Sequence, residues 1–117
     1  HQGLVNYLLK REETERMKQL AIEKFDYVKK AFQNKENNII IKIGLPIDNE
    51  NNFEHIWFEL IELNEDQFKA KLLQEPYDVK DIHEGDERTF TVNDITNWLI
   101  YTPSFTIQPE SVYLLER

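Results

Sequence analysis

The chain has 117 residues, of which 40% are hydrophobic, 12% aromatic and 31% charged, and it contains no cysteine. This length supports one domain with a single core, and the lack of cysteine excludes disulfides, thiolate metal sites and a cysteine nucleophile. Residues 1–38 carry 8 Lys or Arg and 6 Asp or Glu, whereas residues 39–117 carry 6 and 16, for a net charge of −8. Because an acidic surface repels phosphate backbones and anionic lipids, we expect neither nucleic acid nor a membrane as a partner.

Residues 11–34 are predicted to form an amphipathic helix. Its apolar positions recur at helical spacing, and they are Met17, Leu20, Ala21, Phe25, Val28 and Phe32. We interpret residues 1–10 as a tag remnant or a mobile lead segment, and residues 11–117 as one domain. The apolar residues at positions 4, 5, 8 and 9 leave a second possibility open, one long helix whose first half is exposed.

Beyond residue 38 the apolar pattern changes to that of strands. Residues 39–47 are rich in β-branched side chains and close on Pro46, which cannot donate to a ladder. A polar turn over residues 48–52 leads to a second strand over 53–63, and a tight turn at 64–66 leads to a third. Two antiparallel strands joined this tightly form a hairpin.

Residues 75–87 form a long acidic connection, and further short strands follow from residue 88 onward. Asn93 or Asp94 is suited to cap a short helical turn between two of these strands. A helix followed by short strands without intervening helices is typical of the α+β class. We therefore predict an N-terminal amphipathic helix packed on a bent antiparallel sheet, partly closed like a barrel.

The second predicted strand, FEHIWFELIEL, places polar and aromatic residues on one face. Strand alternation puts Phe53, His55, Trp57, Glu59, Ile61 and Leu63 together. His55 and Glu59 lie about 13 Å apart at a rise of roughly 3.3 Å per residue, too far for a direct hydrogen bond. A catalytic His55 would therefore need an acid from another segment, such as Asp94. We also expect Trp57 and Trp98 to be buried and to pack together, as core or as the floor of a pocket.

The sequence offers no motif for a cofactor, and we predict none. The three glycines cannot form a nucleotide loop, and neither serine lies near a histidine in the sequence. Residues 48–59 match a calcium loop at Asp48, Glu50, Asn52 and Glu59, but phenylalanine replaces the glycine required at the sixth position. We therefore expect no metal site.

Short motifs between residues 39 and 101 resemble the bacterial family known as domain of unknown function 2314, the YegJ-like group. The strings EHIWFEL, QEP and DITNW carry the resemblance, through Glu54, His55, Trp57, Pro76, Gly85, Asp94, Ile95 and Trp98. Two positions differ from the family pattern, where Gln74 replaces an asparagine and Asn97 replaces an acidic residue. The resemblance implies a domain type and assigns no chemistry.

We predict a noncatalytic module of the bacterial cytoplasm that binds an unknown small ligand or a protein. The candidate ligand-binding residues are His55, Trp57, Glu59, Asp94 and Trp98. One alternative is a small hydrolase or metal-dependent enzyme that uses His55 with a nearby carboxylate. Another is an immunity-like inhibitor that meets a basic protein through Asp78, Asp81 and Glu84.

Overall fold

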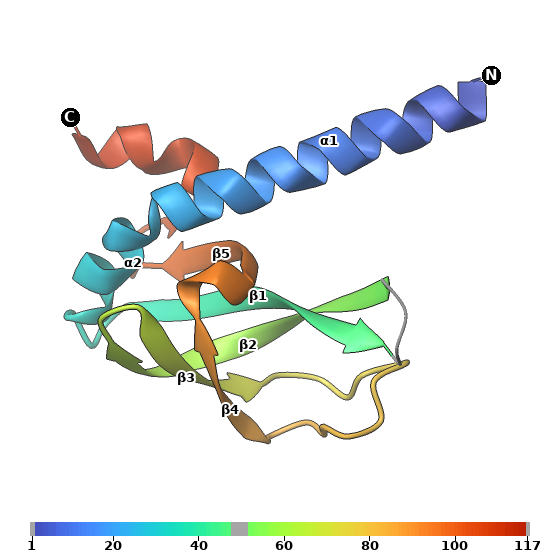
Figure 1. The fold of residues 1–117 in the computed structure, drawn as a ribbon. Coiled ribbons are helices and arrows are strands. Elements are labelled where there is room, and N and C mark those ends of the chain that lie inside the picture. The colour runs from blue at the N-terminus through green and yellow to red at the C-terminus, as the bar shows by residue number, and fades with distance from the viewer. Residues whose placement is uncertain (1, 48–51, 117) are drawn as a thin grey trace.

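The N-terminal part of the chain forms two helices, α1 (Gln2–Glu23) and α2 (Phe25–Phe32). They come from a computed structural model that describes residues 2–47 and 52–116. The single helix predicted over 11–34 is thus divided at Lys24, whose backbone angles (φ −98°, ψ 14°) leave the helical region. This break changes the direction of the chain, so that α2 can follow the curve of the sheet (Figure 1).

The first half of α1 projects beyond the sheet. Figure 1 shows this part of the helix in blue, pointing away from the rest of the molecule. Its large apolar side chains are between 47% and 59% exposed, and they are Leu4, Val5, Leu8 and Leu9. Of the two arrangements considered for these residues, the structure contains the long helix with an exposed first half.

The described strands form one antiparallel sheet in the order β4-β3-β2-β1-β5-β6. The strands are β1 (Asn38–Ile47), β2 (Asn52–Asn64), β3 (Gln67–Leu72), β4 (Glu87–Thr91), β5 (Ile95–Tyr101) and β6 (Thr106–Ile107). Two 3₁₀ helices, η1 (Val92–Asp94) and η2 (Pro109–Glu116), complete the fold. The α+β class and the antiparallel sheet are confirmed. The expected turn at 48–52 falls mostly on residues 48–51, which lie outside the described residues.

The sheet is open rather than partly closed into a barrel, which corrects that part of the prediction. Only η1 separates β4 from β5 along the chain, although these strands lie far apart in the strand order. The connection therefore crosses one face of the bent sheet, as Figure 1 shows. Strands β4 and β6 remain at the two edges of the described sheet.

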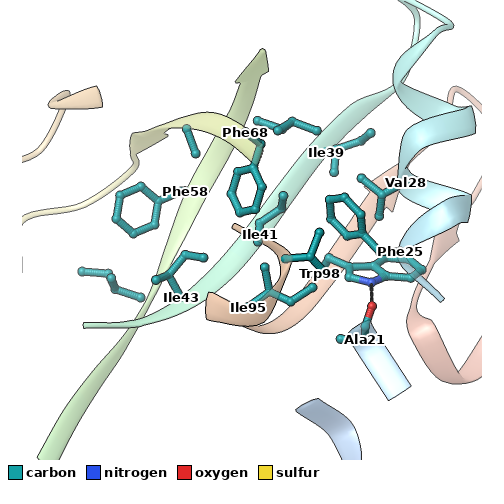
Figure 2. Close-up of a cluster of buried hydrophobic side chains, with 14 of the residues drawn as sticks. Ala21, Phe25, Val28, Ile39, Ile41, Ile43, Phe58, Phe68, Ile95 and Trp98 are labelled. Carbon is teal, nitrogen blue, oxygen red and sulfur yellow. Dashed lines mark hydrogen bonds between the residues drawn. The ribbon is translucent and has the colours of Figure 1, made fainter. Parts of the chain in front are cut away.

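The core lies on the face of the sheet that packs against α2 and the C-terminal end of α1. In register across three strands, Ile41 pairs with Phe58 of β2 and with Trp98 of β5, and all three are fully buried. Phe25 of α2 packs against Phe68 of β3, with ring centroids 6.0 Å apart (Figure 2). Burial of these large side chains is the main source of stability for a domain of this size.

Trp57 and Trp98 lie on opposite faces of the sheet. Trp98 is fully buried, as predicted, whereas Trp57 is only partly buried on the outer face. Trp57 pairs in register with Lys42, while Trp98 pairs with Ile41, the neighbouring residue on β1. Because successive residues of a strand point to opposite faces, the two rings do not pack together, and that prediction was wrong.

A β-bulge in β2 changes which residues share the outer face. The register shifts between Leu60 and Glu62, so that Leu63 pairs with the buried Phe68 and packs against the core. Strict alternation would have placed Leu63 beside His55 and Trp57. The extra residue of a bulge reverses this alternation, so the predicted face is correct only up to Glu59.

Candidate functional site

A hollow lies between the middle of α1 and the face of strands β1, β2 and β5 that bears Lys42 and His55. We call it the helix–hairpin groove, and its volume is about 390 Å³. Its lining comprises Lys10, Glu13, Thr14 and Met17 of α1 and Lys42, His55, Thr96 and Asn97 of the sheet. A space of this size is within the usual range for a small-molecule site.

His55 lies over the backbone of β1 because its partner on that strand is a glycine. Gly44 pairs in register with His55, and a Cβ atom placed on Gly44 would lie 3.1 Å from Cε1 and 3.2 Å from Nδ1 of the imidazole. Glycine inside a strand costs stability and commonly marks a close approach of another group. Here Gly44 gives the imidazole room to lie flat at the edge of the groove.

The surroundings of His55 favour the neutral form of its imidazole. Its pKa is lowered, first because packing over β1 removes water from the ring and then because Lys42 and Lys18 repel a positive charge. No described carboxylate forms a hydrogen bond or ion pair with His55. The described residues therefore supply no acid that would orient His55 as a general base.

Trp57 positions Lys42 on the outer face of the sheet. The Lys42 Nζ lies 5.5 Å from the centroid of the Trp57 ring, which is within the range of a cation–π interaction. Lys42 forms no ion pair with any described residue. The threonine hydroxyl of Thr96 donates a 3.2 Å hydrogen bond to the Lys42 carbonyl oxygen and thereby ties the β5 bulge to β1.

The other sequence-predicted residues lie at different distances from the groove. Asp94 borders a smaller hollow that also includes His55, but its carboxylate accepts a 2.9 Å hydrogen bond from the Thr91 backbone and caps η1. Glu59 lies further along the outer face, where it pairs in register with Ile40 and Lys71. Trp98 belongs to the core. The structure therefore brings only His55, Trp57 and Asp94 into one region.

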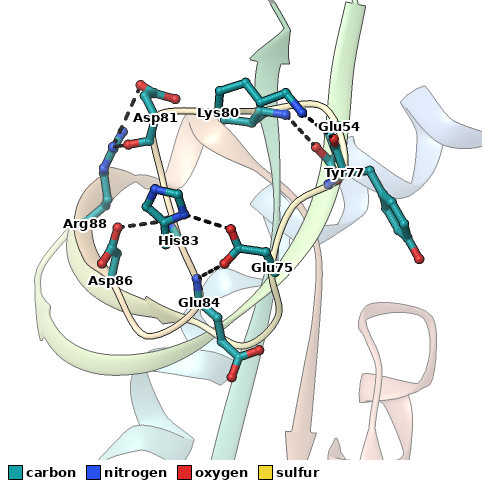
Figure 3. Close-up of polar contacts among 10 residues, drawn as sticks. Glu54, Glu75, Tyr77, Lys80, Asp81, His83, Glu84, Asp86 and Arg88 are labelled. Atoms are coloured by element: carbon teal, nitrogen blue, oxygen red, sulfur yellow. Dashed lines mark hydrogen bonds and ion pairs between the residues drawn. The ribbon is translucent and has the colours of Figure 1, made fainter.

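The acidic connection between β3 and β4 is a folded loop rather than a solvated turn. The Glu54 carboxylate accepts hydrogen bonds from the backbone N–H groups of Tyr77, Asp78 and Val79, at 2.7, 3.0 and 3.1 Å (Figure 3). Burial alone would raise the pKa of Glu54, but these bonds and the charge of Lys80 lower it overall. Val79 and Ile82 bury their side chains in the core.

A second set of contacts closes the far end of this loop. The Glu75 carboxylate binds His83 Nδ1 at 2.8 Å and the Glu84 backbone N–H at 2.9 Å (Figure 3). Gly85 closes the turn with a φ of 91°, a conformation that glycine adopts without strain.

The three acids predicted to bind a partner differ in whether their carboxylates already contact another side chain. Asp81 is exposed and lies 3.8 Å from the guanidinium of Arg88. The carboxylates of Asp78 and Glu84 are exposed and contact no described side chain. Of the three, only these two remain fully available to a partner.

A family model described as an uncharacterized protein conserved in bacteria, DUF2314, matches residues 6–108. The chain belongs to this family. The match extends beyond the 39–101 segment that carries the sequence resemblance, and it covers every residue that lines the helix–hairpin groove of the DUF2314 domain. No curated protein and no solved structure matches the chain.

Sequence reasoning missed most of the groove in this DUF2314 domain. The sequence placed Lys10 in a lead segment and Thr14 and Met17 on a helix, but it did not predict which part of the sheet these residues face. Lys42 was the available signal, because it is the one charged residue in the otherwise apolar string IIIKIGLPI. A single cation in such a strand indicates that one face of the sheet is not covered by the core.

The described part of the DUF2314 domain contains neither a cluster of metal-binding side chains nor a membrane-spanning helix. Within residues 2–47 and 52–116, no three His, Cys, Asp or Glu side chains are grouped closely enough to hold a metal ion. Asp48 and Glu50 of the calcium-loop match lie outside that part of the chain. None of the described helices is both long enough and apolar enough to span a bilayer.

Proposed function

We propose that the domain is a noncatalytic binding module and that the helix–hairpin groove is its ligand site. The observation that carries the proposal is the position of His55, which borders the groove without a hydrogen bond to any described carboxylate. In catalytic triads a histidine base is oriented by an acid that fixes its tautomer and stabilises its charge, and no described carboxylate does this for His55. A neutral imidazole beside a lysine and an amide is instead suited to recognise polar groups on a ligand.

The hydrolase alternative is less well supported. It requires an acid within hydrogen-bond distance of His55, and the nearest candidate identified from the sequence, Asp94, is engaged in capping η1. The inhibitor alternative depends on exposed acids in the β3–β4 loop. Several acids of this loop bind groups of the loop itself, and this internal use favours a structural role.

Chemical-shift mapping with a fragment mixture tests the proposal. ¹⁵N-labelled protein would be titrated with anionic, cationic and neutral fragments at millimolar concentration. We expect saturable changes in the backbone amide chemical shifts of residues 13–18, 42–44, 55–57 and 96–97. These changes should be smaller in the variant His55→Ala. Lys71→Ala, on the same face of the sheet but outside the groove, is the matched control and should leave them unchanged.

Two outcomes would contradict the proposal. Saturable shifts confined to another surface would assign the ligand site elsewhere. Turnover of simple carboxylate or phosphate esters, lost in His55→Ala and retained in Lys71→Ala, would favour the hydrolase.

A further inference from the structure

The sheet side of the helix–hairpin groove contains a cation without a carboxylate partner. Lys42 is half-buried, and its ammonium group is held against the Trp57 ring rather than by an acid. A cation with reduced access to water is stabilised by a nearby negative charge. Glu13 lines the same groove, but no described carboxylate forms an ion pair with Lys42, so the position is suited to an anionic group on a ligand.

Asn97 provides hydrogen-bond donors next to this cation. It pairs in register with Lys42 on the adjacent strand, so both side chains point to the outer face about 5 Å apart at the backbone. Its Oδ1 accepts a 2.8 Å hydrogen bond from the Trp98 backbone N–H. The Nδ2 group, with two N–H donors, is left without a described partner.

The charged groups that act on His55 are also cations. Lys42 and Lys18 both lower the pKa of the imidazole, and no acid is among the groups that act on it. This holds although the protein carries a net charge of −8 and Glu13 lines the groove. His55 therefore has two lysines as charged neighbours on a molecule whose net charge is −8.

We propose that the groove binds its ligand through a carboxylate group, which accepts hydrogen bonds from Lys42 and Asn97 beside His55. The inference rests on the proposed function and specifies its ligand class. Lys42 and Asn97 both line the groove, so a carboxylate bound there meets a donor on each of two neighbouring strands. Glu13 on the helix wall disfavours a second negative charge, which favours a monocarboxylate over a phosphate. Met17 offers an apolar surface to the rest of the ligand.

An NMR titration with phenylacetate tests this inference. Phenylacetamide has nearly the same shape without the charge, and inorganic phosphate tests the other common oxyanion, all at constant ionic strength. We expect saturable shifts of the His55 ring with phenylacetate alone, together with a rise in the pKa of His55, because the bound carboxylate offsets the two lysines. The His83 ring should not respond.

Two substitutions distinguish binding of phenylacetate in the groove from a general screening of the protein charges by added anions. Lys42→Met keeps the aliphatic stem over Trp57, and we expect phenylacetate to bind roughly tenfold more weakly or not at all, the loss typical of a charge-assisted hydrogen bond. Asn97→Asp keeps the oxygen that accepts from Trp98 and adds a competing carboxylate beside Lys42, so it should weaken binding as well. Lys71→Met, on the same face, should not.

Equal binding of phenylacetate and phenylacetamide would overturn the carboxylate assignment and leave the binding module intact. Saturable binding of phosphate alone would overturn it in favour of a phosphate site. Failure of all three probes, while fragments of other chemistry bind in the groove, would reject the ligand class only. Failure of every fragment in the groove would reject the proposed function too.

Discussion

The indole Nε1 of Trp98, in β5, donates a 2.9 Å hydrogen bond to the carbonyl oxygen of Ala21, in α1. Both residues are fully buried, and the bond joins segments 77 positions apart in the chain (Figure 2). Trp98 belongs to the same buried cluster as Phe25, the residue that follows the break at Lys24 (Figure 2). This contact fixes the C-terminal end of α1 on the sheet and so sets the direction of the middle of the helix, which lines the groove.

Replacing Trp98 with phenylalanine should destabilise the domain by roughly 2–4 kcal/mol, because it removes the bond to Ala21 and leaves a cavity in the core. The matched change Trp57→Phe, on the outer face, should cost less than about 1 kcal/mol. Urea unfolding followed by circular dichroism measures both. Equal losses at the two positions would contradict the assignment of the tryptophans to opposite faces.

Glu54→Gln should loosen the β3–β4 loop, because a neutral amide is a weaker acceptor than a carboxylate for the three backbone N–H groups. We expect faster hydrogen exchange at Tyr77, Asp78 and Val79, with little change in β1. Since the folded pKa of Glu54 is lowered, its contribution is present above the unfolded pKa and lost as the pH falls through the folded pKa. Unchanged exchange in the variant would show that Glu54 does not hold the loop.

His55 and His83 should titrate on opposite sides of the ordinary histidine pKa. The pKa of His83 is raised by its hydrogen bond to Glu75, whereas that of His55 is lowered by burial and by two lysines. His83 therefore stabilises the fold below its unfolded pKa, and this contribution is lost as the pH rises through the folded value. For His55 the sign is reversed, and stability falls as the pH drops from the unfolded pKa towards the lower folded pKa.

An NMR pH titration of the ring protons measures both values. Glu75→Gln should lower the pKa of His83 and leave that of His55 in place. If the two rings had the same pKa, or if both pKa values changed equally in Glu75→Gln, the different surroundings assigned to His55 and His83 would be wrong.

Substitutions at two glycines should separate close packing from backbone conformation. Gly44→Ala removes strand flexibility but brings a Cβ atom to 3.1 Å from the His55 ring, so we expect a stability change within about 1 kcal/mol and a clear shift of the His55 resonances. Gly85→Ala meets open space, but its φ of 91° is unfavourable for alanine and should cost roughly 1–2 kcal/mol. If the His55 resonances of Gly44→Ala had the same chemical shifts as those of the unsubstituted protein, the ring would not lie over β1.

The class of fold could be predicted from the order of the residues, because that class follows from local periodicity. Helical spacing of Phe25 and Val28 identified a face that is buried in the structure, and alternation from Ile39 onward identified β1. The turn at 64–66 predicted the β2–β3 hairpin. Each of these inferences needs only the geometry of one element and the burial of its apolar side chains.

The residues of the candidate site could not be predicted in the same way, because they come together only when the whole chain packs. The bulge after Leu60 and the break at Lys24 depend on how strands and helices fit together, and neither has a clear local signal. The groove joins Thr14 of α1 to Lys42 and Asn97, which are brought together by strand order and by the direction of α1. Periodicity assigns a residue to a face of its own element, whereas the partner that the face meets is set by packing over the whole chain.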